Sequence, residues 1–149
     1  VEWNNHYVAN KWLLLDADLS VSRARYTQDD PAGNFIPGAV NRVASLGVSV
    51  TDFHQWFGSW QWRYFGPRPL VEDNSVKSAG TLLTNLRLGY RFSAHTRLVA
   101  DIFNLLDRKA SDIDYYYTSR LKSEATAQDG IVFHPVEPRT LRVSLIHHF

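Results

Sequence analysis

The chain has 149 residues, enough for one domain with a hydrophobic core, and its formal net charge at pH 7 is only +1. This near-neutral balance gives no reason to expect a nucleic-acid partner. The absence of cysteine excludes a disulfide framework, a thiolate metal site and a thiol nucleophile. No run approaches the ~18 consecutive apolar residues of a membrane-spanning helix, so any membrane would have to be crossed by strands.

The start of the chain carries no targeting signal. Val1 is followed by neither a positively charged region nor an apolar segment, and the sequence contains no methionine. We therefore expect a piece of a longer chain or a processed product.

Apolar and polar residues alternate in six segments, and this period of two predicts strands with two unlike faces. In the first segment, residues 12–27, the apolar residues Leu13, Leu15, Ala17, Leu19 and Val21 occupy alternate positions. The same alternation recurs in residues 42–51, 56–64, 82–92, 98–102 and 139–149. The pattern therefore predicts an all-β, antiparallel protein.

The connections between these segments alternate in length. Residues 52–55 and 93–95 are hairpin-sized, whereas residues 28–41, 66–80 and 106–137 are long and rich in Pro, Gly, Asp and Asn. Short turns at one rim and long loops at the other are typical of outer-membrane β-barrels.

The two faces differ in a way that favours lipid outside and water inside. The apolar face of one segment carries wide side chains that would not fit a narrow lumen (Trp56, Trp60, Trp62 and Tyr64). The other face carries charges of both signs, which can pair across strands and stay solvated in a polar lumen. We expect an up-and-down transmembrane β-barrel segment; the alternative is a soluble antiparallel sandwich or barrel.

The C-terminal strand is apolar at alternate positions and ends on an aromatic residue (Leu141, Val143, Leu145 and Phe149). This ending resembles the C-terminal signal by which outer-membrane barrel proteins are recognised by their assembly machinery. His147 departs from that pattern, because the position is usually apolar or aromatic. The physical basis is that an exposed edge strand can pair with another strand until the barrel closes and neither edge remains free.

Further stretches resemble the last strands of TonB-dependent outer-membrane receptors. "NLLDR" at residues 104–108 resembles the segment that closes the penultimate strand in this family, and "EPR" at residues 137–139 resembles the start of the final strand. The resemblance spans residues 1–149 but matches only the C-terminal part of the family's barrel. A complete receptor would have about 22 strands, an N-terminal plug and a TonB-contacting segment, none of which we expect here.

The resemblance implies active transport and no enzymatic activity. Such receptors bind a scarce, bulky solute, such as a ferric siderophore, a cobalamin or an oligosaccharide, and import it with TonB energy. It implies location in the bacterial outer membrane, with lipid, the plug and remaining strands, TonB and the assembly machinery as partners, and no cofactor. The alternative is a small self-contained β-barrel or sheet protein with a structural or ligand-binding role.

Two long loops contain candidate ligand contacts. In residues 112–121, Tyr115 and Tyr117 precede Arg120, and aromatic rings with a cation can stack on a planar ligand or hold an anionic one. The alternative is that this stretch continues a strand, with Tyr116 packing on its neighbour. Arg68, in the Pro-rich "GPRPL", is a further ligand candidate with a structural role as its alternative.

Metal and catalytic sites have little support. His134 and Glu137 are separated by a Pro-rich stretch that disfavours a helix, and His147 and His148 would point to opposite faces of one strand. Ser59, Ser144 and His148 lack a positioned acid. We expect neither a metal site nor catalytic residues.

Overall fold

The computed structural model describes residues 1–28 and 30–149, and the described chain folds entirely into strands, turns and loops. Its strands are β1 (Glu2–Val8), β2 (Leu13–Val21), β3 (Arg42–Phe53), β4 (Trp56–Phe65), β5 (Thr81–Arg91), β6 (Thr96–Phe103), β7 (Ser111–Ser119), β8 (Gln128–Pro135) and β9 (Thr140–His147). These residues contain no helix of the length and apolarity needed to span a membrane.

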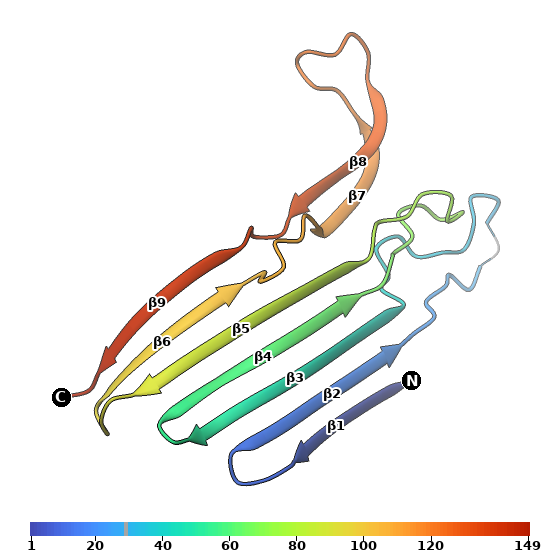
Figure 1. Ribbon diagram of the computed structural model, residues 1–149. Coiled ribbons are helices and arrows are strands. Elements are labelled where there is room, and N and C mark those ends of the chain that lie inside the picture. Colours follow the sequence, from blue (N-terminus) through green and yellow to red (C-terminus); the bar gives the residue numbers. More distant parts are fainter. Residues whose placement is uncertain (29) are drawn as a thin grey trace.

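Seven strands form one sheet in the order β1-β2-β3-β4-β5-β6-β9, and every neighbouring pair is antiparallel. The β7–β8 hairpin forms a separate two-stranded sheet and projects beyond the loop end of the main sheet (Figure 1). The main sheet is a single open layer with β1 and β9 at opposite edges (Figure 1). The predicted all-β, antiparallel, up-and-down order is confirmed.

The predicted contrast in connection length is also confirmed. Two residues, His54 and Gln55, join β3 to β4, and both have positive φ (50° and 75°), as a tight turn that matches strand twist requires. The short turns lie at one end of the sheet and the long connections at the other (Figure 1). The sheet therefore has a turn end and a loop end.

The strand register collects apolar side chains on one side of the sheet, here called the apolar face. Directly opposed residues of an antiparallel sheet share a face, and one row crosses all seven strands (Tyr7, Leu15, Val48, Trp60, Leu86, Ile102 and Leu141). The next row of this face toward the loop end contains Asn5, Ala17, Leu46, Trp62 and Thr84, and the row after that contains Trp3, Leu19, Ala44, Tyr64 and Leu82. The alternation in the sequence thus produces a continuous apolar surface.

The other side, here called the polar face, carries charged and hydrogen-bonding groups. A row through its middle contains Ser49, Ser59, Arg87, Asp101 and Arg142. A parallel row contains His6, Asp16, Gly47, Gln61 and Asn85. The strand register thus places apolar and polar side chains on opposite faces, as the sequence predicts.

The part of the chain that the structure describes has almost no hydrophobic core. Leu70 (6% exposed) and Val99 (7%) are the buried hydrophobic residues of the described chain, and no large side chain is fully buried. A water-soluble domain of this length would bury roughly two thirds of the surface of its unfolded chain. Nothing in the described chain covers either face of the sheet, so the apolar face lacks the second layer that a globular fold supplies.

The asparagine of the "NLLDR" segment fixes the end of β6. The Asn104 backbone has positive φ (47°), and its side chain donates to the carbonyl oxygens of Arg108 and Glu137, both at 3.0 Å. The Asp107 carboxylate accepts a hydrogen bond from the Arg139 amide at 3.2 Å. The segment therefore ties the end of β6 to the start of β9, across the excursion that contains β7 and β8.

The predicted count of six strands is wrong, and the first predicted strand is too long. Strand β1 is absent from the prediction because "EWNNHYV" has polar residues on both faces; its backbone nevertheless pairs with β2. Residues 106–137, expected as a loop, contain β7 and β8, which pair only with each other among the described strands. Strand β2 ends at Val21 rather than Thr27, where the chain leaves the sheet to form the first long loop.

Candidate functional site

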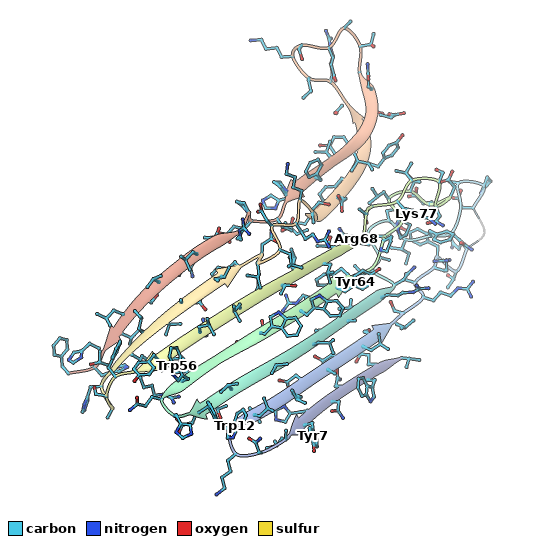
Figure 2. The ribbon with its side chains drawn as sticks, in the orientation of Figure 1. Tyr7, Trp12, Trp56, Tyr64, Arg68 and Lys77 are labelled. Atoms are coloured by element: carbon cyan, nitrogen blue, oxygen red, sulfur yellow. The ribbon has the colours of Figure 1, made fainter. Side chains whose placement is uncertain are left out.

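The apolar face is exposed or half-buried over most of its extent. Trp60 is 42% exposed, and Leu98 (37%) and Val143 (60%) are similarly accessible. At the turn end, the ring of Tyr90 lies between Trp56 and Phe92, with centroid distances of 4.9 and 5.1 Å. Figure 2 shows Trp56 at the turn end of β4 and Tyr64 at its loop end. Large apolar side chains here contact solvent instead of a protein core.

The polar face contains ion pairs between residues of different strands. Arg87 binds the Asp101 carboxylate through two nitrogens, at 2.6 and 3.3 Å, and the two residues face each other across β5 and β6. Arg91 binds Asp52 at 2.9 Å. Bidentate arginine–carboxylate geometry orders both side chains, so Arg87 and Asp101 neutralise each other on this face.

A polar hollow of about 310 Å³ opens on this face around Gly47. Asp16, Asp18, Gln61, Arg63 and Asn85 contribute to its lining. The hydroxyl of Ser45 donates to Asp18 at 2.8 Å. Because Gly47 has no side chain, it leaves space between the neighbouring side chains, and the hollow can receive polar groups from a facing segment.

The structure places Arg68 in a buried junction between the second long loop and the β7–β8 hairpin. Its Nη2 lies 2.6 Å from the Asp114 carboxylate, and the two side chains are only 14% and 5% exposed. Arg68 also donates to the Asp112 carbonyl oxygen at 3.0 Å, and Ser111 donates to Asp114. These contacts favour the structural alternative for Arg68; its ligand-binding role stays a prediction.

The other predicted ligand contacts lie on or near β7. Tyr115 and Tyr117 are exposed on one face of the hairpin, and Tyr117 lies opposite Gly130, which leaves its ring uncovered on that side. Tyr116 points to the opposite face. Arg120 lies in the turn after β7 and donates to the Glu124 carbonyl oxygen at 3.0 Å. The structure thus places the two tyrosines on one face of the hairpin, whereas Arg68 binds Asp114, whose side chain points to the other face.

The residues of the predicted assembly signal lie at the free edge of the sheet. Leu141, Val143 and Leu145 are on the apolar face of β9, and each is at least 60% exposed. The His148 amide donates to the His95 carbonyl oxygen at 2.9 Å, so the even-numbered residues of β9 bond to β6. The backbone groups of the odd-numbered residues therefore point outward, with Phe149 exposed beyond the strand.

No described cluster of three or more His, Asp or Glu side chains has metal-binding geometry. His134 contacts Asp112 at 2.9 Å rather than Glu137, and this hydrogen bond holds the pKa of the Asp112 carboxyl below its usual value. Ser59 lies opposite Arg87 and Ser144 opposite Val99, so no serine–histidine pair forms in the described sheet.

One feature of the loop end was missed from the sequence. Arg23, Arg25, Arg42 and Lys77 line a common pocket. A sequence signal existed, since Arg23 and Arg25 continue the spacing of Leu19 and Val21. No protein-family model matches the chain.

Proposed function

We propose that this chain is part of the wall of a transmembrane β-barrel in the bacterial outer membrane. The observation that carries the proposal is an apolar sheet face over which residues 1–28 and 30–149 form no second layer. Lipid acyl chains can cover such a face without a steric limit, and the paired charges of the polar face suit a water-filled bore. A soluble sandwich or barrel would place the same apolar face in a packed interior.

The dimensions of the apolar face support this assignment. Trp56 and Tyr64 mark its two ends on β4, and the eight residue-to-residue steps from one to the other span about 27 Å along the strand. With a strand tilt of about 40°, that length projects to about 21 Å along the membrane normal, close to the roughly 25 Å apolar band of outer-membrane barrels. Aromatic residues at both limits match the preference of Trp and Tyr for the membrane interface.

The number of strands supports a larger barrel. In an antiparallel sheet of seven strands the first and the last run in the same direction, so β1 and β9 are parallel (Figure 1). Bacterial outer-membrane barrels formed by one chain have an even number of antiparallel strands. An odd number of additional strands is then required between β9 and β1, about 15 for a 22-stranded barrel.

More specifically, we propose that the chain is part of a TonB-dependent receptor. Such a receptor would bind and import a scarce bulky solute of the siderophore, cobalamin or oligosaccharide class. This step rests on the resemblance of "NLLDR", "EPR" and the terminal phenylalanine to that family. In such a receptor the polar face would contact the plug, and the loop end would face outside the cell. Tyr115, Tyr117 and Arg120 are then candidates for solute contact on the β7–β8 hairpin.

Single-cysteine labelling along β4 tests the barrel wall, because the chain has no cysteine of its own. In protein reconstituted in lipid vesicles, nitroxide labels at positions 60 and 62 should be accessible to lipid-soluble oxygen. Labels at positions 59 and 61 should be accessible to a water-soluble relaxation agent instead. If positions 60 and 62 are protected from both reagents, the apolar face is packed against protein and the proposal is wrong.

Replacing the terminal aromatic residue tests the assembly signal. We expect Phe149→Ala to reduce assembly into the outer membrane about tenfold, since a buried phenylalanine contributes about 1.5–3 kcal/mol to a contact. His148→Ala is the matched control, because its backbone bond to His95 is kept. The measurement is the amount of folded protein in isolated outer membranes; equal amounts for Phe149→Ala and wild type would contradict the signal.

A further inference from the structure

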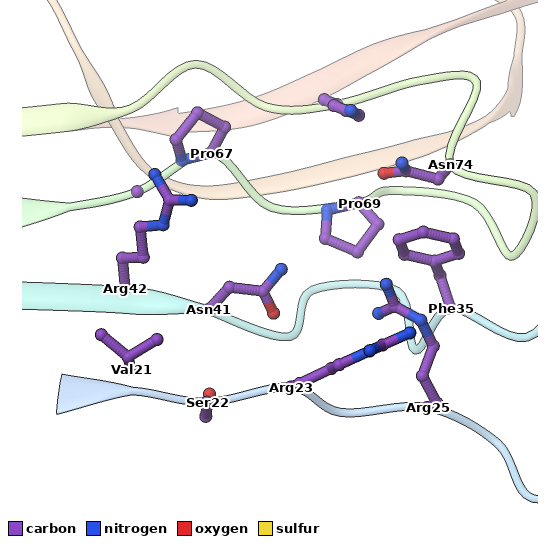
Figure 3. Close-up of a pocket in the computed structure, with 12 residues that line it drawn as sticks. Val21, Ser22, Arg23, Arg25, Phe35, Asn41, Arg42, Pro67, Pro69 and Asn74 are labelled. Carbon is purple, nitrogen blue, oxygen red and sulfur yellow. The ribbon is translucent and has the colours of Figure 1, made fainter. Parts of the chain in front are cut away.

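Four basic side chains line a single pocket at the loop end of the sheet. The pocket has a volume of about 390 Å³ and lies between the loop that follows β2 and the loop that follows β4. Its cations are Arg23, Arg25, Arg42 and Lys77, and no carboxylate contributes to the lining. Figure 3 shows Arg42 extending toward Pro67, and Arg23 extending toward Arg25 and Phe35.

The register places this pocket on the side of the sheet that carries the apolar face. Arg42 is directly opposite Val21, and its carbonyl oxygen accepts the Gly66 amide at 2.8 Å. Val21, Arg42 and Gly66 therefore form the row immediately beyond Leu19, Ala44 and Tyr64, about 7 Å further along the strands. The basic residues therefore lie directly beyond Tyr64, the aromatic residue that marks the loop end of the apolar face.

The pocket has the charge and the polar groups of an anion site. Within the described chain, none of the four cations has a carboxylate within 4.0 Å. Arg25 is held over the Phe35 ring at 3.4 Å from its centroid, which orders the guanidinium. Asn41 also lines the pocket, and its Oδ1 is buried without a hydrogen-bond partner in the described chain.

We propose that this pocket binds the phosphate group of a lipid headgroup in the membrane leaflet at the loop end. The inference rests on the proposed barrel wall and adds a partner to it. The guanidinium group of arginine can donate two parallel hydrogen bonds to phosphate oxygens. The Asn41 side-chain oxygen can accept a hydrogen bond from a hydroxyl or amide group of the same headgroup. A lipid is favoured over a soluble anion because the pocket opens just beyond the surface that acyl chains would cover.

Lipid selectivity in the full protein tests the proposal. The protein is reconstituted in phosphatidylcholine vesicles, and spin-labelled phosphatidic acid and phosphatidylcholine are compared for their association with its surface. We expect phosphatidic acid to be preferred, and the preference to fall about fivefold for each of Arg23→Gln, Arg42→Gln and Lys77→Gln. Arg42→Lys should keep most of the preference, because it keeps the charge.

The matched control is Arg63→Gln. Arg63 lies on β4 at the same end of the sheet but lines the hollow of the polar face, so this variant should leave the lipid preference unchanged. An equal loss of the preference for phosphatidic acid in Arg63→Gln and Arg42→Gln would show a non-specific charge effect and overturn the proposal. Displacement of the lipid by millimolar inorganic phosphate would assign the pocket to a soluble anion and overturn it as well.

The same measurement separates this proposal from the barrel wall. If motionally restricted lipid is present but shows no preference for phosphatidic acid, the headgroup site is wrong and the barrel wall stands. If no restricted lipid is detected for either probe, the protein has no lipid-facing surface and both proposals fail.

Discussion

Leu86→Arg should prevent stable folding in lipid bilayers. Leu86 lies in the central row of the apolar face, opposite Trp60 on β4 and Ile102 on β6. An arginine on the lipid side of a barrel costs about 2–4 kcal/mol near the bilayer midplane. The measurement is the free energy of unfolding in vesicles, obtained from urea titration of the folded fraction.

Gln61→Arg is the control for this substitution. Gln61 and Asn85 form the adjacent opposed pair on the same two strands, so position 61 lies at nearly the same depth but on the polar face. Because the side chain of Gln61 is exposed to the polar side, the added arginine should remain hydrated and change stability little. Equal destabilisation by the two variants would show that neither face is in lipid.

Asp114→Ala should release the β7–β8 hairpin from the second long loop. The substitution removes the carboxylate that Arg68 contacts at 2.6 Å and leaves the guanidinium, which is 14% exposed, without its charge partner. Breaking a buried pair in this way costs about 3–5 kcal/mol, and the lower end applies because Arg68 keeps the Asp112 carbonyl oxygen and the Ser78 hydroxyl. Amide hydrogen exchange of β7 should accelerate by about a hundredfold.

Asp112→Ala separates this effect from a general loss of charge on the hairpin. The Asp112 carboxylate contacts His134 at the surface, whereas its carbonyl oxygen, which Arg68 binds, is unchanged by the substitution. Exchange of β7 should therefore stay close to wild type. A double variant, Arg68→Met with Asp114→Leu, should recover much of the protection, because an apolar pair replaces two desolvated charges. Unchanged exchange in Asp114→Ala would mean that the pair does not hold the hairpin.

The strands with clear alternation could be predicted from sequence, and those without it could not. In residues 56–64 and 82–92 the alternate side chains are large and apolar except at Gly58 and Thr84, and the structure places these residues on one face. In β1 the sequence Asn4-Asn5-His6 hides the period, although the backbone forms a regular ladder with β2. Main-chain hydrogen bonds do not depend on side-chain polarity, so a strand at an edge can lack the expected pattern.

The contacts between loops could not be predicted. Arg68 and Asp114 are 46 residues apart, and their contact depends on how the second long loop and the β7–β8 hairpin leave the sheet. The basic pocket likewise combines Arg23 and Arg25 with Lys77 from another loop. A sequence pattern reports the local direction of a side chain, but it carries no information on which distant loop lies beside it.

The sequence by itself determined the strand period, the two unlike faces and the alternation of short and long connections, because side-chain direction and turn preference are local properties of the backbone. The tertiary structure decided which residues oppose each other across the sheet, which loop carries Arg68 to Asp114, and that the described residues form no layer over the apolar face. Those features depend on register and on packing between distant segments, which only the folded chain brings together.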